Sequence, residues 1–124
     1  MPRHDTPKPR CNGQWTEPRF RSFIVSALRR ASCRWAPKHL CRKQARIARN
    51  QYRCAACSAI VGNKDIHLDH VLPVVDPVRG FQGWDEFIAR LFVEADGFRA
   101  ICKACHAETT AQQREARKLK RKHT

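Results

Sequence analysis

Apolar residues recur at helical spacing in the first third of the chain, beginning just after Thr16. Such spacing places them on one face of a helix, and they are Phe20, Phe23, Ile24, Ala27, Leu28, Ala31 and Trp35. Thr16 is a suitable N-cap, Pro18 is tolerated in a first helical turn, and Pro37 ends the segment. The pattern predicts an amphipathic helix whose outer face is basic, with Arg19, Arg29, Arg30 and Arg34.

A weaker apolar stripe predicts a second basic helix at about residues 38–49, which Asn50 is placed to end. The stripe consists of Leu40, Ala45, Ile47 and Ala48. Residues 1–15 instead combine three prolines and Gly13 with charged residues, a composition that buries little apolar surface. We therefore expect residues 1–15 to be a disordered basic N-terminus and residues 16–50 to be a basic helical arm.

The middle of the chain predicts two short strands, at residues 59–61 and 66–71, around a turn at residues 62–65. In a regular pleat His67 and Asp69 point to one face of the second strand, and His70 points to the other. Downstream, the strongest helical stripe of the chain is expected to face the core, with Trp84, Phe87, Ile88, Leu91 and Phe92. Residues from His106 onward predict a final helix that continues into a basic tail. The fold class expected from this order is α+β.

Charge is distributed unevenly along the 124 residues, whose formal net charge is +14. Residues 1–50 carry 13 Lys and Arg against two acidic residues, and residues 111–124 carry six against one. Residues 51–110 carry six basic and eight acidic residues. Cationic flanks around a near-neutral centre suit a polyanion such as nucleic acid better than a generic solubilising surface. Neither flank has the strongly apolar face of a membrane-surface helix, so no membrane partner is expected.

Four of the seven cysteines form two C-x-x-C pairs, Cys54 with Cys57 and Cys102 with Cys105. Two such pairs in one short chain are typical of a structural Zn²⁺ site, and a core this small benefits from a metal. Paired disulfides, a redox dithiol and an iron–sulfur cluster are the alternatives. The odd cysteine count and the lack of an apolar leader after Met1 favour reduced thiols and a cytoplasmic location.

Aspartate and histidine residues, which are hard and borderline metal ligands, lie close to these cysteines in the sequence. Asp69 and His70 end the second predicted strand, and His106 follows Cys105 directly. Asp69 and His106 form an incomplete ligand set for Mg²⁺ or another divalent ion, and a neutral His70 has the basicity to take a proton from water. His67 shares a strand face with Asp69 and is either a further ligand or a packing histidine. Phosphodiester hydrolysis needs such a base beside such a cation.

The order of these motifs resembles the HNH endonucleases of the ββα-metal type, in the zinc-knuckle form common in tailed phages. The residues that carry the resemblance are Tyr52-x-Cys54-x-x-Cys57, Asp69-His70-Val71-Leu72-Pro73-Val74, Gly83-Trp84-x-x-Phe87-Ile88-x-Arg90-Leu91-Phe92 and Ile101-Cys102-x-x-Cys105-His106. The resemblance implies a zinc-stapled ββα module at residues 51–113, followed by a basic C-terminal helix or tail at residues 114–124. It also implies that His70 is the general base, that Asp69 and His106 hold the catalytic ion, and that the four cysteines hold zinc.

Two positions depart from the family pattern. The family's middle Asn is replaced by Gly97, with Asp96 as its nearest polar neighbour, and the Lys-Thr that often follows the last histidine reads Thr109-Thr110. In the family that Asn orients the hairpin loop or assists the metal.

The sequence thus predicts a metal-dependent DNA endonuclease of low sequence specificity, acting in the cytoplasm, which is the host cytoplasm if a phage encodes it. A link to phage packaging proteins follows from the resemblance alone. The alternative is a non-catalytic zinc-knuckle protein that binds nucleic acid. In either case the phosphate contacts expected are Arg29, Arg30, Arg34, Arg42, Lys43, Arg46, Lys118, Lys120 and Arg121.

Overall fold

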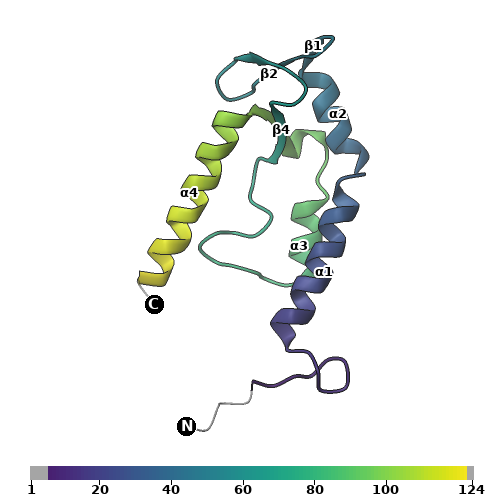
Figure 1. The fold of residues 1–124 in the computed structure, drawn as a ribbon, viewed down its shortest axis with the longest axis vertical. Coiled ribbons are helices and arrows are strands. Elements are labelled where there is room, and N and C mark those ends of the chain that lie inside the picture. Colours follow the sequence, from purple (N-terminus) through teal and green to yellow (C-terminus); the bar gives the residue numbers. More distant parts are fainter. Residues whose placement is uncertain (1–5, 123–124) are drawn as a thin grey trace. The chain divides into compact units, whose positions relative to one another are not determined.

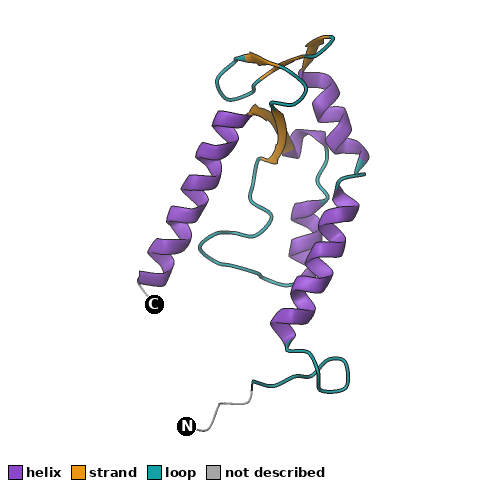
Figure 2. Cartoon of the chain, in the orientation of Figure 1, coloured by secondary structure: helices purple, strands orange, loops and turns teal. Residues whose placement is uncertain are grey.

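A computed structural model describes residues 6–122, with side chains to residue 119, and divides the chain into two units. The first unit is Met1–Arg34 and the second is Trp35–Thr124. The helices and strands are coloured along the chain in Figure 1 and by type in Figure 2. Small sheets and several helices make this an α+β protein, as expected from the sequence.

The first unit contains helix α1 (Glu17–Ser32). Thr16 caps it as predicted, because its Oγ1 accepts a hydrogen bond from the Arg19 N–H at 3.3 Å. The helix ends at Ser32, one turn before the expected Trp35. Residues 10–15, which we expected to be disordered, form a turn closed by a bridge between Arg10 and Trp15. Residues 1–5 of the expected disordered segment lie outside the described residues.

The second unit begins with α2 (Ala36–Ala45), which is shorter than expected. Residues 46–49 do not continue the helix, because Arg46–Ala48 forms strand β1 and pairs with β2 (Gln51–Arg53). Asn50 adopts a positive φ of 57° in the turn between these strands, so it closes a hairpin and ends no helix. The prediction of a helix for residues 46–49 was therefore wrong, because strand pairing with β2 outweighs the weak apolar stripe of these residues. The predicted arm at residues 16–50 is divided between the two units.

The two predicted middle strands exist as β3 (Ile60–Val61) and β4 (Ile66–His70), but they do not pair with each other. β3 extends the first sheet, whose order is β1-β2-β3. β4 pairs antiparallel with β5 (Phe98–Cys102), in a register that places His70 opposite Phe98 and Ile66 opposite Cys102. Helix α4 (Lys103–Lys122) follows β5 directly.

The connection between β4 and β5 contains α3 (Trp84–Leu91) and a 3₁₀ turn, η1 (Ala95–Gly97). The apolar stripe of α3 faces the core as expected at Phe87 and Leu91, which are 2% and 1% exposed. Ile88 of the same stripe is 43% exposed. The Trp35 indole donates a hydrogen bond to the Val93 carbonyl at 2.6 Å, which ties the start of α2 to the end of this connection.

A small buried cluster lies at the cysteines. Ile101 and Cys54 are almost fully buried, Cys102 is buried, and Val61 and Cys105 pack against them. A core of this size gains much of its stability from a cross-link or a metal.

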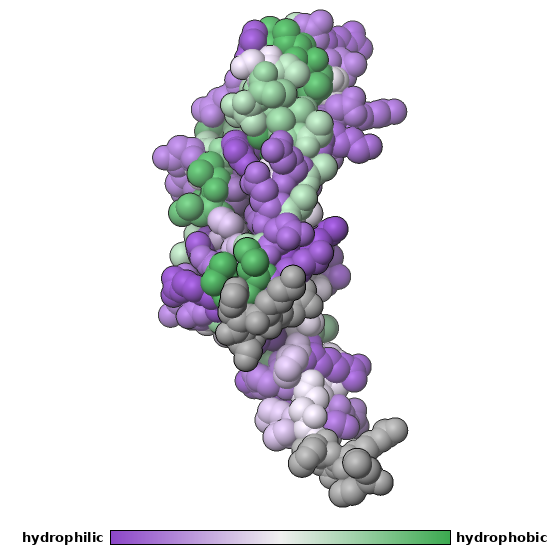
Figure 3. Space-filling view, turned by 90° about the vertical axis from the view of Figure 1, so that its left-hand side faces the viewer, coloured by the Kyte–Doolittle hydropathy of each residue, from purple (hydrophilic) through white to green (hydrophobic). Residues whose placement is uncertain are grey.

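Hydrophilic residues cover much of the face drawn in Figure 3, with hydrophobic residues scattered among them.

Within the described residues, no helix combines the length and the apolar character needed to cross a membrane.

Candidate metal centre and the adjoining polar site

The four cysteines of the two C-x-x-C pairs come together from three elements. Cys54 and Cys57 lie in the turn after β2, Cys102 ends β5, and Cys105 lies in the first turn of α4. Their Sγ atoms are all within 4.8 Å of one another. Four sulfurs at about 2.3 Å from a tetrahedral ion would be about 3.8 Å apart. Cys57 and Cys102 are separated by 3.8 Å, so the cluster is of a size that can hold a metal ion.

Backbone N–H groups point at the most buried sulfur of the cluster. Cys54 Sγ accepts from the N–H groups of Cys102 at 3.3 Å and of Ala56 and Cys57 at 3.4 Å. Burial by itself would raise the pKa of the Cys54 thiol, but these donors outweigh it and lower that pKa to about 6. These donors favour the thiolate, which is the form of cysteine that binds a metal.

The neighbouring sulfurs have the opposite effect on Cys105. Its contacts with the Cys102 and Cys57 sulfurs, followed by burial, raise the pKa of Cys105 to about 12. The cluster cannot hold several negative charges without a cation between them, since like charges at this separation repel. All seven cysteines are free thiols, which disagrees with the disulfide alternative.

Asp69 and His70 are the last two residues of β4, and His106 lies in the first turn of α4. The rings of His67 and His106 stack with centroids 5.0 Å apart and planes at 20°, so β4 lies against the first turn of α4. His67 is therefore a contact partner of His106, and its Nε2 is buried without a hydrogen bond. Among the described residues, the four cysteines form the only group of three or more ligands with atoms so close together. The assignment of Asp69 and His106 to a catalytic ion stays a prediction.

Asp69 already has a cationic neighbour. Arg99, its cross-strand partner on β5, places Nη2 3.8 Å from Asp69 Oδ2. The same Nη2 donates to Thr109 Oγ1 at 3.1 Å, and the Thr109 hydroxyl donates to the Cys105 carbonyl at 3.2 Å. This chain of contacts links the carboxylate to α4. The sequence analysis did not identify Arg99 as a neighbour of Asp69, because only the register of β4 and β5 brings the two residues together.

His70 faces the other side of β4, as the pleat predicted. Its Nε2 lies 2.9 Å from the Leu91 carbonyl, and its ring packs at 4.7 Å from the Phe98 ring. A carbonyl only accepts, so Nε2 carries the proton and donates it to Leu91. Nδ1 of the neutral ring consequently keeps its lone pair. Asp69 and His70 are on opposite faces, but as consecutive residues they border the same strand end.

The expected phosphate contacts fall into three groups. Arg29 and Arg30 lie in the last turn of α1, and Arg34 follows that helix in the first unit. Lys118 lies on α4, 3.6 Å from Glu115, while the side chains of Lys120 and Arg121 lie outside the described part of the chain. A single pocket brings together Arg42, Lys43 and Arg46.

No family model, no curated protein and no solved structure matches this chain. Function is therefore inferred from the site and from the motif resemblance.

Proposed function

We propose that this protein is a metal-dependent endonuclease that hydrolyses phosphodiester bonds in DNA, built as an HNH module on a structural zinc. The observation that carries the proposal is the contact of His67 with His106 at 5.0 Å. It brings the strand that ends in Asp69-His70 against the helix that begins with Cys105-His106, beside the four-cysteine cluster. The antiparallel pair of β4 and β5, followed by α4, supports a ββα module in which α3 and η1 lie in the connection between the strands.

The donor set favours zinc as the ion held by the cysteines. Four sulfurs with no oxygen or nitrogen ligand among them suit a soft or borderline ion. The site joins β2, β5 and α4, so the ion would fix the start of α4 relative to β5. His106 follows Cys105 directly and would be positioned by the same bond.

His70 would serve as the general base. Its Nε2–H is held by the Leu91 carbonyl, which fixes the tautomer and leaves the Nδ1 lone pair to accept a proton from water. The same carbonyl stabilises the imidazolium once the proton has been taken. Asp69 and His106 would hold a divalent cation, Mg²⁺ or another, which when bound supplies charge stabilisation at the scissile phosphate and the leaving oxygen.

Gly97 explains how the chain can do without the family's Asn. A Cβ on Gly97 would lie 2.6 Å from Val93 Cγ2, so no side chain fits there while Val93 keeps its place. The Gly97 carbonyl instead accepts a hydrogen bond from the Val71 N–H at 2.9 Å, directly after His70. This backbone hydrogen bond can hold the end of β4 in place without the side-chain amide of an Asn. Asp96 is exposed and lies in η1, and its role as a replacement stays a hypothesis.

One observation favours the alternative, a zinc-knuckle protein that binds nucleic acid without cutting it. Arg99 lies 3.8 Å from Asp69 Oδ2, so a metal ion at that carboxylate must share it with a guanidinium. A permanent Asp69–Arg99 pair would leave His106 without a partner ligand. In the endonuclease, Arg99 would move away from Asp69 when a metal ion and a phosphate bind. In the non-catalytic protein, Arg99 would stay paired with Asp69.

The deciding experiment measures nicking of supercoiled plasmid by the zinc-loaded protein with Mg²⁺, Mn²⁺, Ni²⁺ or EDTA. We expect nicking that requires the added cation and that falls at least about 100-fold in His70→Ala, the usual contribution of a general base. Asp69→Asn should lose activity similarly, whereas Asp65→Asn, an exposed carboxylate in the turn before β4, should not. Plasmid that shifts in a gel but is never nicked would establish the binder instead.

A further inference from the structure

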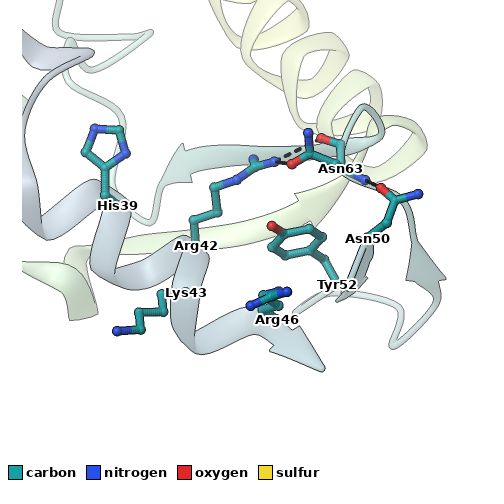
Figure 4. A pocket seen from close by; sticks show the side chains of 7 residues that line it. All are labelled: His39, Arg42, Lys43, Arg46, Asn50, Tyr52 and Asn63. Atoms are coloured by element: carbon teal, nitrogen blue, oxygen red, sulfur yellow. Dashed lines mark hydrogen bonds between the residues drawn. The ribbon is translucent and has the colours of Figure 1, made fainter. Parts of the chain in front are cut away.

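A pocket of about 500 Å³ lies between α2 and the first sheet, away from the residues assigned to catalysis. One wall comes from α2 and the first residue of β1, namely His39, Arg42, Lys43 and Arg46. The other wall comes from the sheet and its turns, namely Asn50, Tyr52 and Asn63. Figure 4 shows Arg42 reaching from α2 to Asn63, with the Tyr52 ring beside it. The volume is within the range of small-ligand sites.

Three cations on this wall repel one another. Residues 39, 42 and 43 are spaced by three and four along α2, so they lie on one side of that helix, and Arg46, directly after the helix, lines the same pocket. No acidic residue lines the pocket, and none of the ion pairs found among the described residues includes Arg42, Lys43 or Arg46. Like charges on adjacent turns are unfavourable unless an anion lies between them. The pocket is therefore electrostatically suited to a negatively charged group.

Arg42 is held in place before any ligand arrives. Its Nη2 donates to the Asn63 carbonyl at 3.0 Å and also to the Asn63 side-chain oxygen, and its guanidinium lies 4.8 Å from the centre of the Tyr52 ring. Asn63 is fixed in turn, since its N–H donates to Asn50 Oδ1 at 2.8 Å. A guanidinium has five donors, so the other N–H groups of Arg42 remain available. An arginine ordered in advance loses less entropy when it binds.

We propose that this pocket binds a phosphate group of a nucleic-acid backbone. A fixed guanidinium with nearby cationic side chains matches the geometry and charge of a phosphate. The amides of Asn50 and Asn63 and the Tyr52 hydroxyl add neutral hydrogen-bonding groups for the adjoining sugar. The inference rests on the proposed function only for naming DNA as the source of the phosphate, because the binding chemistry is independent of cleavage.

The test compares two double variants with equal loss of charge. Arg42→Gln with Arg46→Gln removes two cations from the pocket, and Arg49→Gln with Lys64→Gln removes two exposed cations just outside it. Binding of a fluorescent 20-base-pair duplex to the zinc-loaded protein is measured by anisotropy without added Mg²⁺, Mn²⁺ or Ni²⁺, at several salt concentrations. Without an added cation no cleavage is expected, so a failure of this inference is separate from a failure of the nuclease proposal.

We expect the pocket variant to weaken duplex binding about tenfold or more relative to the control variant. Its slope of log affinity against log salt should fall by about one unit, since a single phosphate contact contributes about 0.9. Equal losses in the two variants would overturn the inference, because they would show a general effect of net charge.

Further arms identify the source of the phosphate. Inorganic phosphate, AMP and phosphatidylglycerol vesicles are tested with the same two variants. A difference between variants seen with the duplex and absent with vesicles supports a nucleic-acid backbone, whereas a difference seen only with AMP or only with vesicles overturns that assignment. Lys43→Gln, which alters an exposed side chain of the pocket, repeats the test if the double pocket variant does not fold.

Discussion

The four cysteines and the three proposed catalytic residues, Asp69, His70 and His106, differ in what their side chains contact. Four sulfurs lie within 4.8 Å of one another, with backbone N–H donors on Cys54. Each of the three proposed catalytic side chains contacts another residue, although Asp69 Oδ2 is buried without a hydrogen bond. Asp69 faces Arg99, His70 donates to Leu91, and His106 stacks on His67.

This difference indicates different tasks. Thiols that would repel one another as thiolates need a cation to be stable, so an ion held by the four cysteines would be part of the fold. Asp69 already lies 3.8 Å from Arg99, so an ion at this carboxylate would compete with the guanidinium. The first site should bind metal permanently, and the second should bind it weakly, together with a phosphate. The predictions below test the two halves of this contrast.

The largest effect is expected from removing a sulfur. Cys54→Ser should abolish tight zinc binding, and because zinc sites of this kind contribute roughly 10–16 kcal/mol, the second unit should lose its cooperative unfolding transition. Cys33→Ser is the matched control, since Cys33 is exposed and lies outside the cluster. Metal content by mass spectrometry and thermal unfolding by circular dichroism give the answer. A Cys54→Ser protein that keeps one zinc per chain and its melting temperature would contradict the cysteine assignment.

A smaller effect is expected at Gly97, which supports the strand end that carries His70. Gly97→Ala should destabilise the protein by about 1–3 kcal/mol, because its Cβ would overlap Val93. Gly62→Ala is the control, since its nearest contact is an ordinary 3.4 Å to Asn50.

Combining Gly97→Ala with Val93→Ala checks the cause. The double variant should recover part of the loss, so the two single effects on urea unfolding should not add. Full additivity would mean that Val93 is not what excludes a side chain at Gly97.

Sequence patterns predicted the elements that local chemistry defines. The N-cap at Thr16 and the core positions of Phe87 and Leu91 are confirmed, because capping and helical periodicity act within a few residues. The convergence of the two C-x-x-C pairs is also confirmed, since the metal chemistry of four thiols implies it.

The pairing of strands that are distant in the sequence could not be predicted from local patterns. Nothing local says that β4 pairs with β5 across the connection that contains α3, or that residues 46–48 leave their helix to pair with β2. The neighbours of the polar site, Arg99 opposite Asp69 and the Leu91 carbonyl at His70, follow from that pairing and from the return of α3. The cysteine cluster could therefore be predicted from the sequence, whereas the neighbours of Asp69 and His70 could not.

Arg99 offers a direct way to sharpen the contrast between the two sites. Arg99→Gln removes the cation beside Asp69, so binding of Mn²⁺ measured by calorimetry on the zinc-loaded protein should strengthen about two- to fivefold. The gain is modest because Arg99 is 35% exposed and partly screened. Arg53→Gln, an exposed cation on β2, is the control. Unchanged Mn²⁺ affinity in Arg99→Gln would mean that Asp69 is not a ligand of that ion.

The smallest effect concerns Asp76, whose carboxylate, like the Cys54 sulfur, accepts hydrogen bonds from backbone N–H groups, but which is half-buried whereas Cys54 is buried. The N–H groups of Arg79 and Val78, at 2.9 Å and 2.8 Å from Asp76 Oδ1, hold the pKa of that carboxyl below its usual value. A lowered folded pKa means that Asp76 stabilises its turn above the ordinary carboxyl pKa, and that this contribution is lost as pH falls through the lowered value. In a nuclear magnetic resonance titration, the Val78 and Arg79 amide shifts should move together with the Asp76 carboxyl, below the ordinary aspartate pKa of about 3.9. Titration of Asp76 at that ordinary value would show that solvent screens these bonds, and that backbone donors lower the pKa of Asp76 less effectively than that of the buried Cys54.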